Sequence, residues 1–357
     1  MENIVNYADA FPDLILEIMD FFSFDNLEID QNTRKANPKS VADFILHYKQ
    51  KYLPDKNLQP RLITKICDKL CDLQVLSLIS SGRAADYTST YLFSSSNKWS
   101  NLTRDIKRIA VQRYECAVYG FSYIYDLYRS MIVPIIYYTE AGDITVGTGF
   151  YWGGGIATAK HCLENSIKIS IPNISAALLN QAPIYISDNP YMDVAFIDAD
   201  VYVLDLQKIH GEETSSIRQK LMITNEGNPE IMDEIITMGY PKIPGFTHFQ
   251  TVEKATVSAL PQNRFTSTTG EIVAIENEIW MKENLFLITA KIKGGNSGGP
   301  VFNKFGELVG IVSEIPFSEG DYDDLGYGTA IPVRFLHEIQ QNRQMTMEGI
   351  HFVDYSE

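Results

Sequence analysis

One short turn near the end of the chain constrains its fold and chemistry more than any other feature. Residues 295–300 read Gly-Asn-Ser-Gly-Gly-Pro and place Ser297 among residues with almost no side chain. A serine hydroxyl becomes a nucleophile only beside a general base, and small neighbours let backbone N–H groups converge on a developing oxyanion. Glycine, asparagine and proline also dominate ordinary surface turns. The turn therefore predicts a catalytic serine, provided that a base and an orienting carboxylate occur elsewhere in the chain.

A histidine is the first candidate for that base, and the chain has six. Only His161 has a sequence context that implies rigid placement. Residues 147–152 and 155–162 read as a hairpin whose second strand ends at this histidine, with a glycine cluster as its turn. The other five histidines are interpreted as ordinary core or surface side chains. We therefore predict that His161 is the base.

The third member of such a triad is a carboxylate that fixes the imidazole tautomer and stabilises the imidazolium. Residues 191–200 contain three candidates. Asp193 enters an apolar run, Val194 to Ile197, which would hold its carboxylate at the edge of the core. Asp198 and Asp200 close the same run, where acids are usually solvated. Asp193 is the predicted partner of His161, and Asp198 is the alternative.

With His161, Asp193 and Ser297 in this order, the chain resembles the trypsin-like (chymotrypsin-fold) serine peptidases, and it is most similar to their HtrA/Deg-like branch. The resemblance covers roughly residues 130–340. Its five elements are Thr158-Ala159-Lys160-His161-Cys162, Asp193-Val194-Ala195, Met238-Gly239-Tyr240-Pro241, the run from Gly294 to Pro300, and Gly328-Thr329-Ala330-Ile331-Pro332. Each element alone is a weak pattern, whereas five in the family's order are a strong one.

The resemblance implies a mainly β domain over residues 129–340, built from two six-stranded antiparallel barrels with the triad between them. It implies that the backbone amides of Gly295 and Ser297 hold the oxyanion, and it implies no cofactor and no metal. The strand that ends in Ile311, Val312 and Ser313 would flank the substrate.

Departures from the secreted digestive members of the family bear on control and location. Those enzymes pair a new amino terminus with an aspartate just before the serine. Here that position is Asn296, which cannot form the ion pair, so activation by amino-terminal cleavage is not expected. Cys162 lacks the partner cysteine of those enzymes, and Cys67, Cys71 and Cys116 show no disulfide spacing. Four cysteines without such a framework indicate a reducing compartment.

Features near the ends of the chain also favour a reducing, cytoplasmic compartment. The amino terminus has no basic start and no apolar run of signal length, and no segment reaches the roughly 18 apolar residues of a membrane span. We therefore expect a cytoplasmic protein, unlike most HtrA/Deg-like enzymes. The segment after Pro332 is too short for the PDZ module that is common in that branch.

The first part of the chain reads differently from the rest. We expect a helical domain over residues 1–101, a linker helix over 102–128 and a C-terminal tail over 341–357. Helices are predicted over 13–22, from Ser40 to about Tyr52 behind a capping box, and from Pro60 onward, with strands at 75–79 and 88–93. Helices followed by a strand, a loop and a strand resemble a winged helix-turn-helix domain, although no diagnostic residue supports this.

Charge bears on what that domain binds. The net charge of −15 argues against indiscriminate nucleic-acid binding. Residues 1–30 carry no Lys or Arg, whereas residues 31–110 carry a basic excess that includes Lys65, Lys69 and Arg83. Such a segment would contact phosphates, or it is a solvated face, or it is paired with the acidic amino-terminal helix. We favour a regulatory protein partner over nucleic acid.

Together these features predict an intracellular serine endopeptidase that cleaves proteins, is regulated or targeted by its amino-terminal domain, and acts in bacterial stress or defence. Ser297 would attack the scissile carbonyl, His161 would transfer the proton and Asp193 would orient the imidazole. The alternative is a regulatory protein that binds DNA or a partner, with a protease-fold domain whose peptidase activity is secondary or absent.

Overall fold

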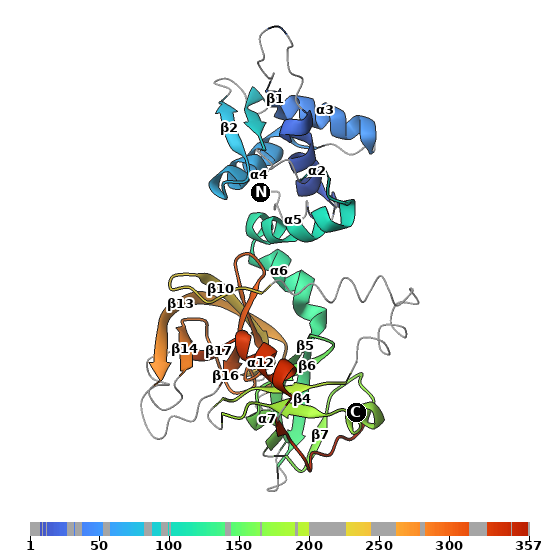
Figure 1. The fold of residues 1–357 in the computed structure, drawn as a ribbon, viewed down its shortest axis with the longest axis vertical. Helices are drawn as coiled ribbons and strands as arrows, with labels where there is room; N and C mark the ends of the chain where they lie inside the picture. The colour runs from blue at the N-terminus through green and yellow to red at the C-terminus, as the bar shows by residue number, and fades with distance from the viewer. Residues whose placement is uncertain are drawn as a thin grey trace, which may run out of the picture. The chain divides into compact units, whose positions relative to one another are not determined.

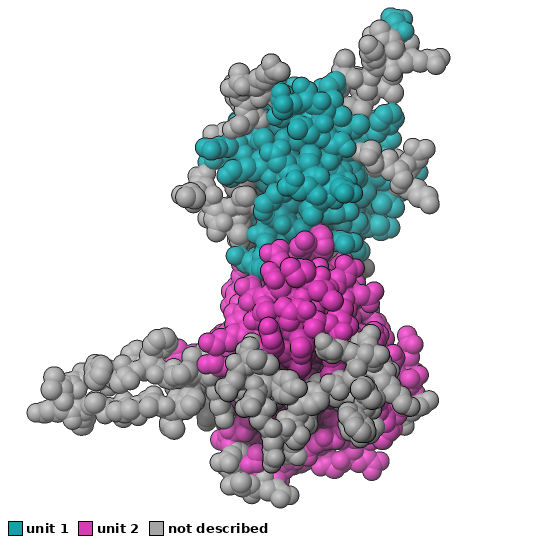
Figure 2. Space-filling view, turned by 90° about the vertical axis from the view of Figure 1, so that its left-hand side faces the viewer, with its two compact units in different colours: residues 1–124 teal, residues 125–357 magenta. Residues whose placement is uncertain are grey.

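A computed structural model describes most of the chain: residues 8, 10–11, 13–26, 32, 38–52, 58–81, 88–93, 99, 101–139, 144–164, 166–189, 192–199, 226–243, 262–278, 283–313, 327–343 and 345–355. The chain divides into two compact units, residues 1–124 and residues 125–357 (Figure 1 and Figure 2). It passes from one unit to the other within helix α6 (Phe121–Tyr128).

Unit 1 combines helices with a small sheet. Its helices are α2 (Leu14–Phe21), α3 (Val41–Lys51), α4 (Pro60–Asp72) and α5 (Arg104–Tyr119), and the 3-10 turn η1 (Phe24–Asn26) follows α2. Strands β1 (Lys39–Ser40), β2 (Ser77–Ser80) and β3 (Thr90–Leu92) form an antiparallel sheet in the order β1-β3-β2. Each predicted helix and strand of this region is present close to its expected position.

Local sequence signals explain where these helices begin. The Ser40 hydroxyl accepts a hydrogen bond from the Asp43 amide, and the Asp43 carboxylate accepts one from the Ser40 amide, which is the capping box expected at the start of α3. Pro60 occupies the first turn of α4, where its missing N–H has no partner to lose. From both helices apolar side chains such as Phe44 and Ile66 enter a common core with α2.

Acidic residues of helix α2 and of its N-cap form ion pairs with four residues of the basic segment. The ion pairs join Glu17 with Lys51 and Arg104, Asp13 with Arg104 and Arg108, and Asp20 with Lys107. Glu17 is only 3% exposed, so its charge is stabilised by these cations rather than by water. Four of the fourteen Lys and Arg residues between positions 31 and 110 are therefore paired with acids inside unit 1.

The residues nominated for a nucleic-acid partner lie in different settings. Lys69 donates a hydrogen bond to the Val118 carbonyl, so it too makes an internal contact. Lys65 is exposed on α4, and Arg83 lies outside the described residues. The winged-helix assignment and the nucleic-acid partner stay predictions.

The structure has two helices where the sequence predicted one linker helix. Helix α5 ends at Gly120, which adopts a φ of 81°, a left-handed value that favours glycine, and α6 begins at the next residue. The Tyr123 hydroxyl in α6 donates to the Glu115 carboxylate in α5 across this break.

Half of unit 2 is a closed six-stranded barrel, as the family resemblance implied. Its strands are β10 (Glu234–Gly239), β13 (Thr266–Glu278), β14 (Glu283–Ile288), β15 (Pro300–Asn303), β16 (Leu308–Ser313) and β17 (Gly328–Pro332). They close in the order β10-β13-β14-β17-β16-β15, and all of these pairs are antiparallel. A short hairpin of β11 (Lys242–Ile243) and β12 (Gln262–Asn263) follows β10.

The other half of unit 2 is a seven-stranded antiparallel sheet, not the second six-stranded barrel that the resemblance implied. Its strands are β4 (Ile132–Tyr138), β5 (Ile144–Trp152), β6 (Gly155–Thr158), β7 (Lys168–Ser170), β8 (Ile184–Ile186), β9 (Ala195–Ile197) and β18 (Met345–Thr346). Their order is β18-β8-β9-β6-β5-β4-β7. Short helices η3 (Arg129–Met131), α7 (His161–Glu164), α8 (Ala176–Leu179) and α12 (Arg334–Asn342) complete the unit.

The C-terminal segment explains this difference, because it joins the two edges of the sheet. β18 pairs with β8 at one edge, and at the other edge the Ile169 amide donates to the His351 carbonyl while the Val353 amide donates to the Ile169 carbonyl. Between these bonds Phe352 is 2% exposed in the core, and the Asn180 side chain bonds both its amide and its carbonyl. The segment predicted to be a tail is an integral part of the sheet's core.

Candidate active site

The β5–β6 hairpin places His161 at the start of α7. Gly153 and Gly154 form its turn with φ values of 56° and 89°, which only glycine adopts easily. Residues 155–158 are buried along β6, and the chain then leaves the sheet at His161. The imidazole therefore lies at the end of a rigid strand, as the sequence predicted.

Asp193 holds this histidine by both its backbone and its ring. The His161 amide donates to Asp193 Oδ1 over 2.8 Å, and His161 Nδ1 lies 2.6 Å from Asp193 Oδ2. A carboxylate can only accept, so Nδ1 carries the ring's proton and Nε2 is left as the base. The Ser313 hydroxyl donates to the same Oδ2 over 2.7 Å. The alternative, Asp198, instead forms an ion pair with Arg343 at 3.3 Å.

The surroundings of the imidazole change its proton affinity. Burial of the ring lowers the pKa of His161, but the hydrogen bond to the Asp193 carboxylate and the contact with the Cys162 thiol outweigh this effect, and the pKa is raised. The protonated form of this imidazole is therefore stabilised where it lies.

Ser297 is held on a buried turn that leads into β15. The Gly298 amide donates to the Val312 carbonyl over 2.7 Å, and the Thr148 amide donates to the Ser297 carbonyl over 2.9 Å. Gly298 has a φ of 84°, and a Cβ atom there would lie 2.1 Å from the Thr148 carbonyl oxygen. The glycine after the serine is thus required both by the backbone conformation and by the close approach of β5.

Residues 293–296 form a turn that orients the candidate oxyanion donors, the backbone amides of Gly295 and Ser297. The Asn296 amide donates to the Lys293 carbonyl over 3.0 Å, and Gly295 in the third position has a φ of 104°. A positive φ in that position defines a type II turn and calls for glycine. Among the described residues, the amides of Gly295 and Ser297 donate no hydrogen bond, so both remain available for an oxyanion.

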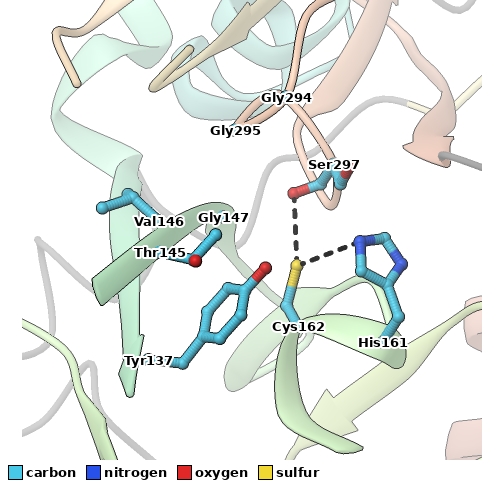
Figure 3. Close-up of a pocket in the computed structure, with 9 residues that line it drawn as sticks. All are labelled: Tyr137, Thr145, Val146, Gly147, His161, Cys162, Gly294, Gly295 and Ser297. Carbon is cyan, nitrogen blue, oxygen red and sulfur yellow. Dashed lines mark hydrogen bonds between the residues drawn. The ribbon is translucent and has the colours of Figure 1, made fainter. Parts of the chain in front are cut away.

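These groups border a small open pocket of about 90 Å³ (Figure 3). Its lining residues are Tyr137, Thr145, Val146, Gly147, His161, Cys162, Gly294, Gly295 and Ser297. His161 and Ser297 therefore border one cavity although they come from different halves of unit 2.

Cys162 takes part in the geometry of this pocket. Figure 3 shows its sulfur between Ser297 and the imidazole, 3.7 Å from His161 Nε2 and 3.8 Å from the Ser297 carbonyl oxygen. Within the described residues no hydrogen bond joins the Ser297 hydroxyl to Nε2. Catalytic hydrogen bonds are often loose in free enzymes and tighten when substrate binds.

The predicted substrate-binding residues all lie on β16, in two different roles. Ile311 and Val312 are fully buried, and the Val312 backbone bonds Gly298 and Gly299 of the serine turn. Ser313 contacts Asp193, a role that the sequence did not reveal. Contact of these three residues with substrate stays a prediction.

The described part of the chain offers no group of three or more His, Cys, Asp or Glu side chains that could hold a metal ion. None of its helices is both long and apolar enough to span a membrane.

Comparison with known proteins agrees with this geometry. Residues 147–311 match the model of the trypsin-like peptidase domain. Protease Do-like 2, chloroplastic, from Arabidopsis thaliana is 24% identical over 208 residues, which are 57% of this chain and 29% of that protein. The probable periplasmic serine endoprotease DegP-like from Buchnera aphidicola subsp. Baizongia pistaciae is 26% identical over 186 residues, 52% of this chain and 33% of that protein. The chain thus spans about a third or less of the length of these relatives.

Among solved structures, the HtrA-type protease AlgW with tripeptide matches with 19% identity and a TM-score of 0.40, over 61% of this chain and 62% of that one. The family model and the curated relatives point to the same class as the motifs around His161, Asp193 and Ser297. The chain therefore contains a trypsin-like peptidase domain with relatives of the HtrA and DegP type, which confirms the resemblance drawn from its sequence.

Proposed function

We propose that this chain is a serine endopeptidase that cleaves protein substrates through Ser297, His161 and Asp193. One observation carries the proposal. The Asp193 carboxylate accepts hydrogen bonds from both the backbone amide and Nδ1 of His161, and His161 and Ser297 line the same pocket. A carboxylate so placed fixes the tautomer in which Nε2 accepts a proton.

The reaction follows from these positions. Ser297 Oγ attacks the scissile carbonyl while His161 Nε2 takes its proton, and the imidazolium is stabilised by Asp193. The oxyanion that forms is held by the free amides of Gly295 and Ser297. The imidazolium then returns the proton to the leaving amine, and water repeats the sequence to release the acyl group from the serine.

Labelling with a fluorophosphonate tests the proposal directly. The reagent phosphonylates serines that an adjacent base activates, so we expect a single adduct on the folded protein, located at Ser297 by mass spectrometry of its peptides. Protein denatured before labelling should carry no adduct. Folded protein that stays unlabelled, or that is labelled at another serine, would contradict the proposal.

We propose as well that unit 1 binds a protein partner that controls or targets the peptidase, in the cytoplasm of a bacterium and in stress or defence. The ion pairs of α2 with α3 and α5 support a protein partner over nucleic acid, because they engage four cations that would otherwise be more available to phosphates. We expect that a mobility-shift assay near 0.15 M salt detects no complex with duplex DNA or RNA. A tight complex at that ionic strength would favour the nucleic-acid alternative.

A further inference from the structure

Thr148 connects the two halves of unit 2 at the catalytic centre. It lies on β5, in the same seven-stranded sheet whose hairpin ends at His161, and its side chain is fully buried. Ser297 and the oxyanion turn belong to the loop that enters the closed barrel at β15. Nucleophile and base are therefore carried by separate substructures, and the groups between them determine whether they meet.

The Thr148 hydroxyl bonds two backbone groups from the barrel side. The Tyr240 amide, just beyond β10, donates to Oγ1 over 3.0 Å. An N–H group can only donate, so Oγ1 accepts there and its own proton goes to the Gly295 carbonyl, 2.6 Å away. The hydroxyl has only one proton, so it donates one hydrogen bond, to the Gly295 carbonyl, and accepts the other, from the Tyr240 amide.

The Thr148 backbone completes the hold on the same turn. Its amide donates to the Ser297 carbonyl over 2.9 Å, and its carbonyl accepts from the Thr158 hydroxyl over 2.8 Å. One residue thus bonds the carbonyls of both Gly295 and Ser297, whose amides are the candidate oxyanion donors.

Tight packing around the hydroxyl leaves it little freedom. A Cβ atom on Gly239 would lie 2.8 Å from Thr148 Oγ1 and 2.8 Å from Asn296 Oδ1, so the end of β10 approaches the turn closely enough to exclude any side chain there. A close-packed hydroxyl with two fixed partners is a rigid anchor for the turn.

We propose that the Thr148 hydroxyl is a positioning residue for catalysis: by bonding the Gly295 carbonyl and the Tyr240 amide, it fixes the oxyanion turn against the half of the unit that carries His161. The inference rests on the proposed peptidase function. Oxyanion donors act only when they are preorganised within a few tenths of an ångström. Without the Thr148 hydrogen bonds the amides of the turn are held less precisely, so they stabilise the transition state less. Ground-state binding, which uses other contacts, should change little.

Replacing Thr148 by valine tests this, because valine keeps the shape and removes the hydroxyl. In full-length protein acting on a fluorogenic peptide, we expect Thr148→Val to lower kcat by about 10- to 100-fold and to leave KM within about threefold. Thr148→Ser keeps the hydroxyl and should retain kcat within about threefold of wild type. If Thr148→Val does not fold, as judged by circular dichroism, Thr148→Ala provides the same comparison with a smaller side chain.

Thr237→Val is the matched control. Thr237 is also a buried β-strand threonine in unit 2, and its hydroxyl bonds Thr268, not the oxyanion turn. We expect this variant to lose thermal stability without losing more than about twofold in kcat.

Three outcomes would overturn the positioning role. They are an unchanged kcat in Thr148→Val, an equal loss in Thr148→Ser, and a loss in Thr237→Val as large as that in Thr148→Val. These results leave the proposed function intact as long as the wild type hydrolyses the peptide. A wild-type protein without hydrolysis or fluorophosphonate labelling would instead refute the peptidase function, and the role of Thr148 with it.

Discussion

Ser297→Ala is expected to lower kcat about a million-fold in hydrolysis of a peptide or of casein. The alanine variant has no nucleophile, so His161 and Asp193 have nothing to activate, and no acyl-enzyme can form. The Gly295 and Ser297 amides remain in place because they are backbone groups. A residual rate of about 10³ to 10⁴ over the uncatalysed reaction should therefore survive, below the detection limit of most assays.

Ser175→Ala is a suitable control for this measurement, because Ser175 is an exposed serine of the same unit with no side-chain cap bond on α8. It should hydrolyse substrate at the wild-type rate. Full activity in Ser297→Ala would show that another group is the nucleophile. Cys162 would then be the first candidate, since its sulfur already lies 3.7 Å from His161 Nε2.

The candidate triad could be selected from the sequence because each member has a local signature. The glycines around Ser297 serve a backbone of positive φ and close approach, which no other residue type satisfies, so the turn is visible in the sequence itself. His161 and Asp193 each adjoin a buried strand whose pattern is equally local. Their chain order carried the family resemblance, which implied the closed barrel correctly and the second barrel incorrectly.

The supports of the triad could not be predicted, because they are contacts between distant segments. Ser313 meets Asp193 across 120 positions, and Thr148 meets Gly295 across 147. A serine or threonine in a strand has the same local pattern whether or not its hydroxyl has such a partner.

Contacts between distant segments also explain why the seven-stranded sheet, in place of a second barrel, could not be predicted. Phe352 lies 172 positions from Asn180, and only the assembled fold shows that the end of the chain fills the core between β7 and β8. Likewise the Asp13 to Arg108 ion pair spans 95 positions, so a charge count along the sequence cannot show that the fold pairs part of the basic segment with the acidic amino-terminal residues.

Asp193→Asn is expected to lower kcat about ten-thousand-fold while leaving the fold and KM nearly unchanged. An amide of the same shape can present its N–H₂ group to His161 Nδ1, which makes Nδ1 an acceptor and moves the ring proton to Nε2. The imidazole then cannot accept the proton of Ser297, and it also loses the negative charge that stabilises the imidazolium. Asp198→Asn changes a carboxylate of the same segment that binds Arg343, and it should keep wild-type activity.

The pH profile separates this explanation from a simple loss of structure. His161 acts as a base only when it is neutral, so kcat/KM rises as pH passes its pKa. The Asp193 carboxylate helps to raise that pKa, which places the acidic limb of the wild-type profile above the ordinary histidine value of about 6.5. Removing the charge in Asp193→Asn lowers the pKa, so the residual activity should keep its plateau to lower pH than the wild type. An acidic limb that stays in place, or moves to higher pH, would show that Asp193 does not set the proton affinity of His161.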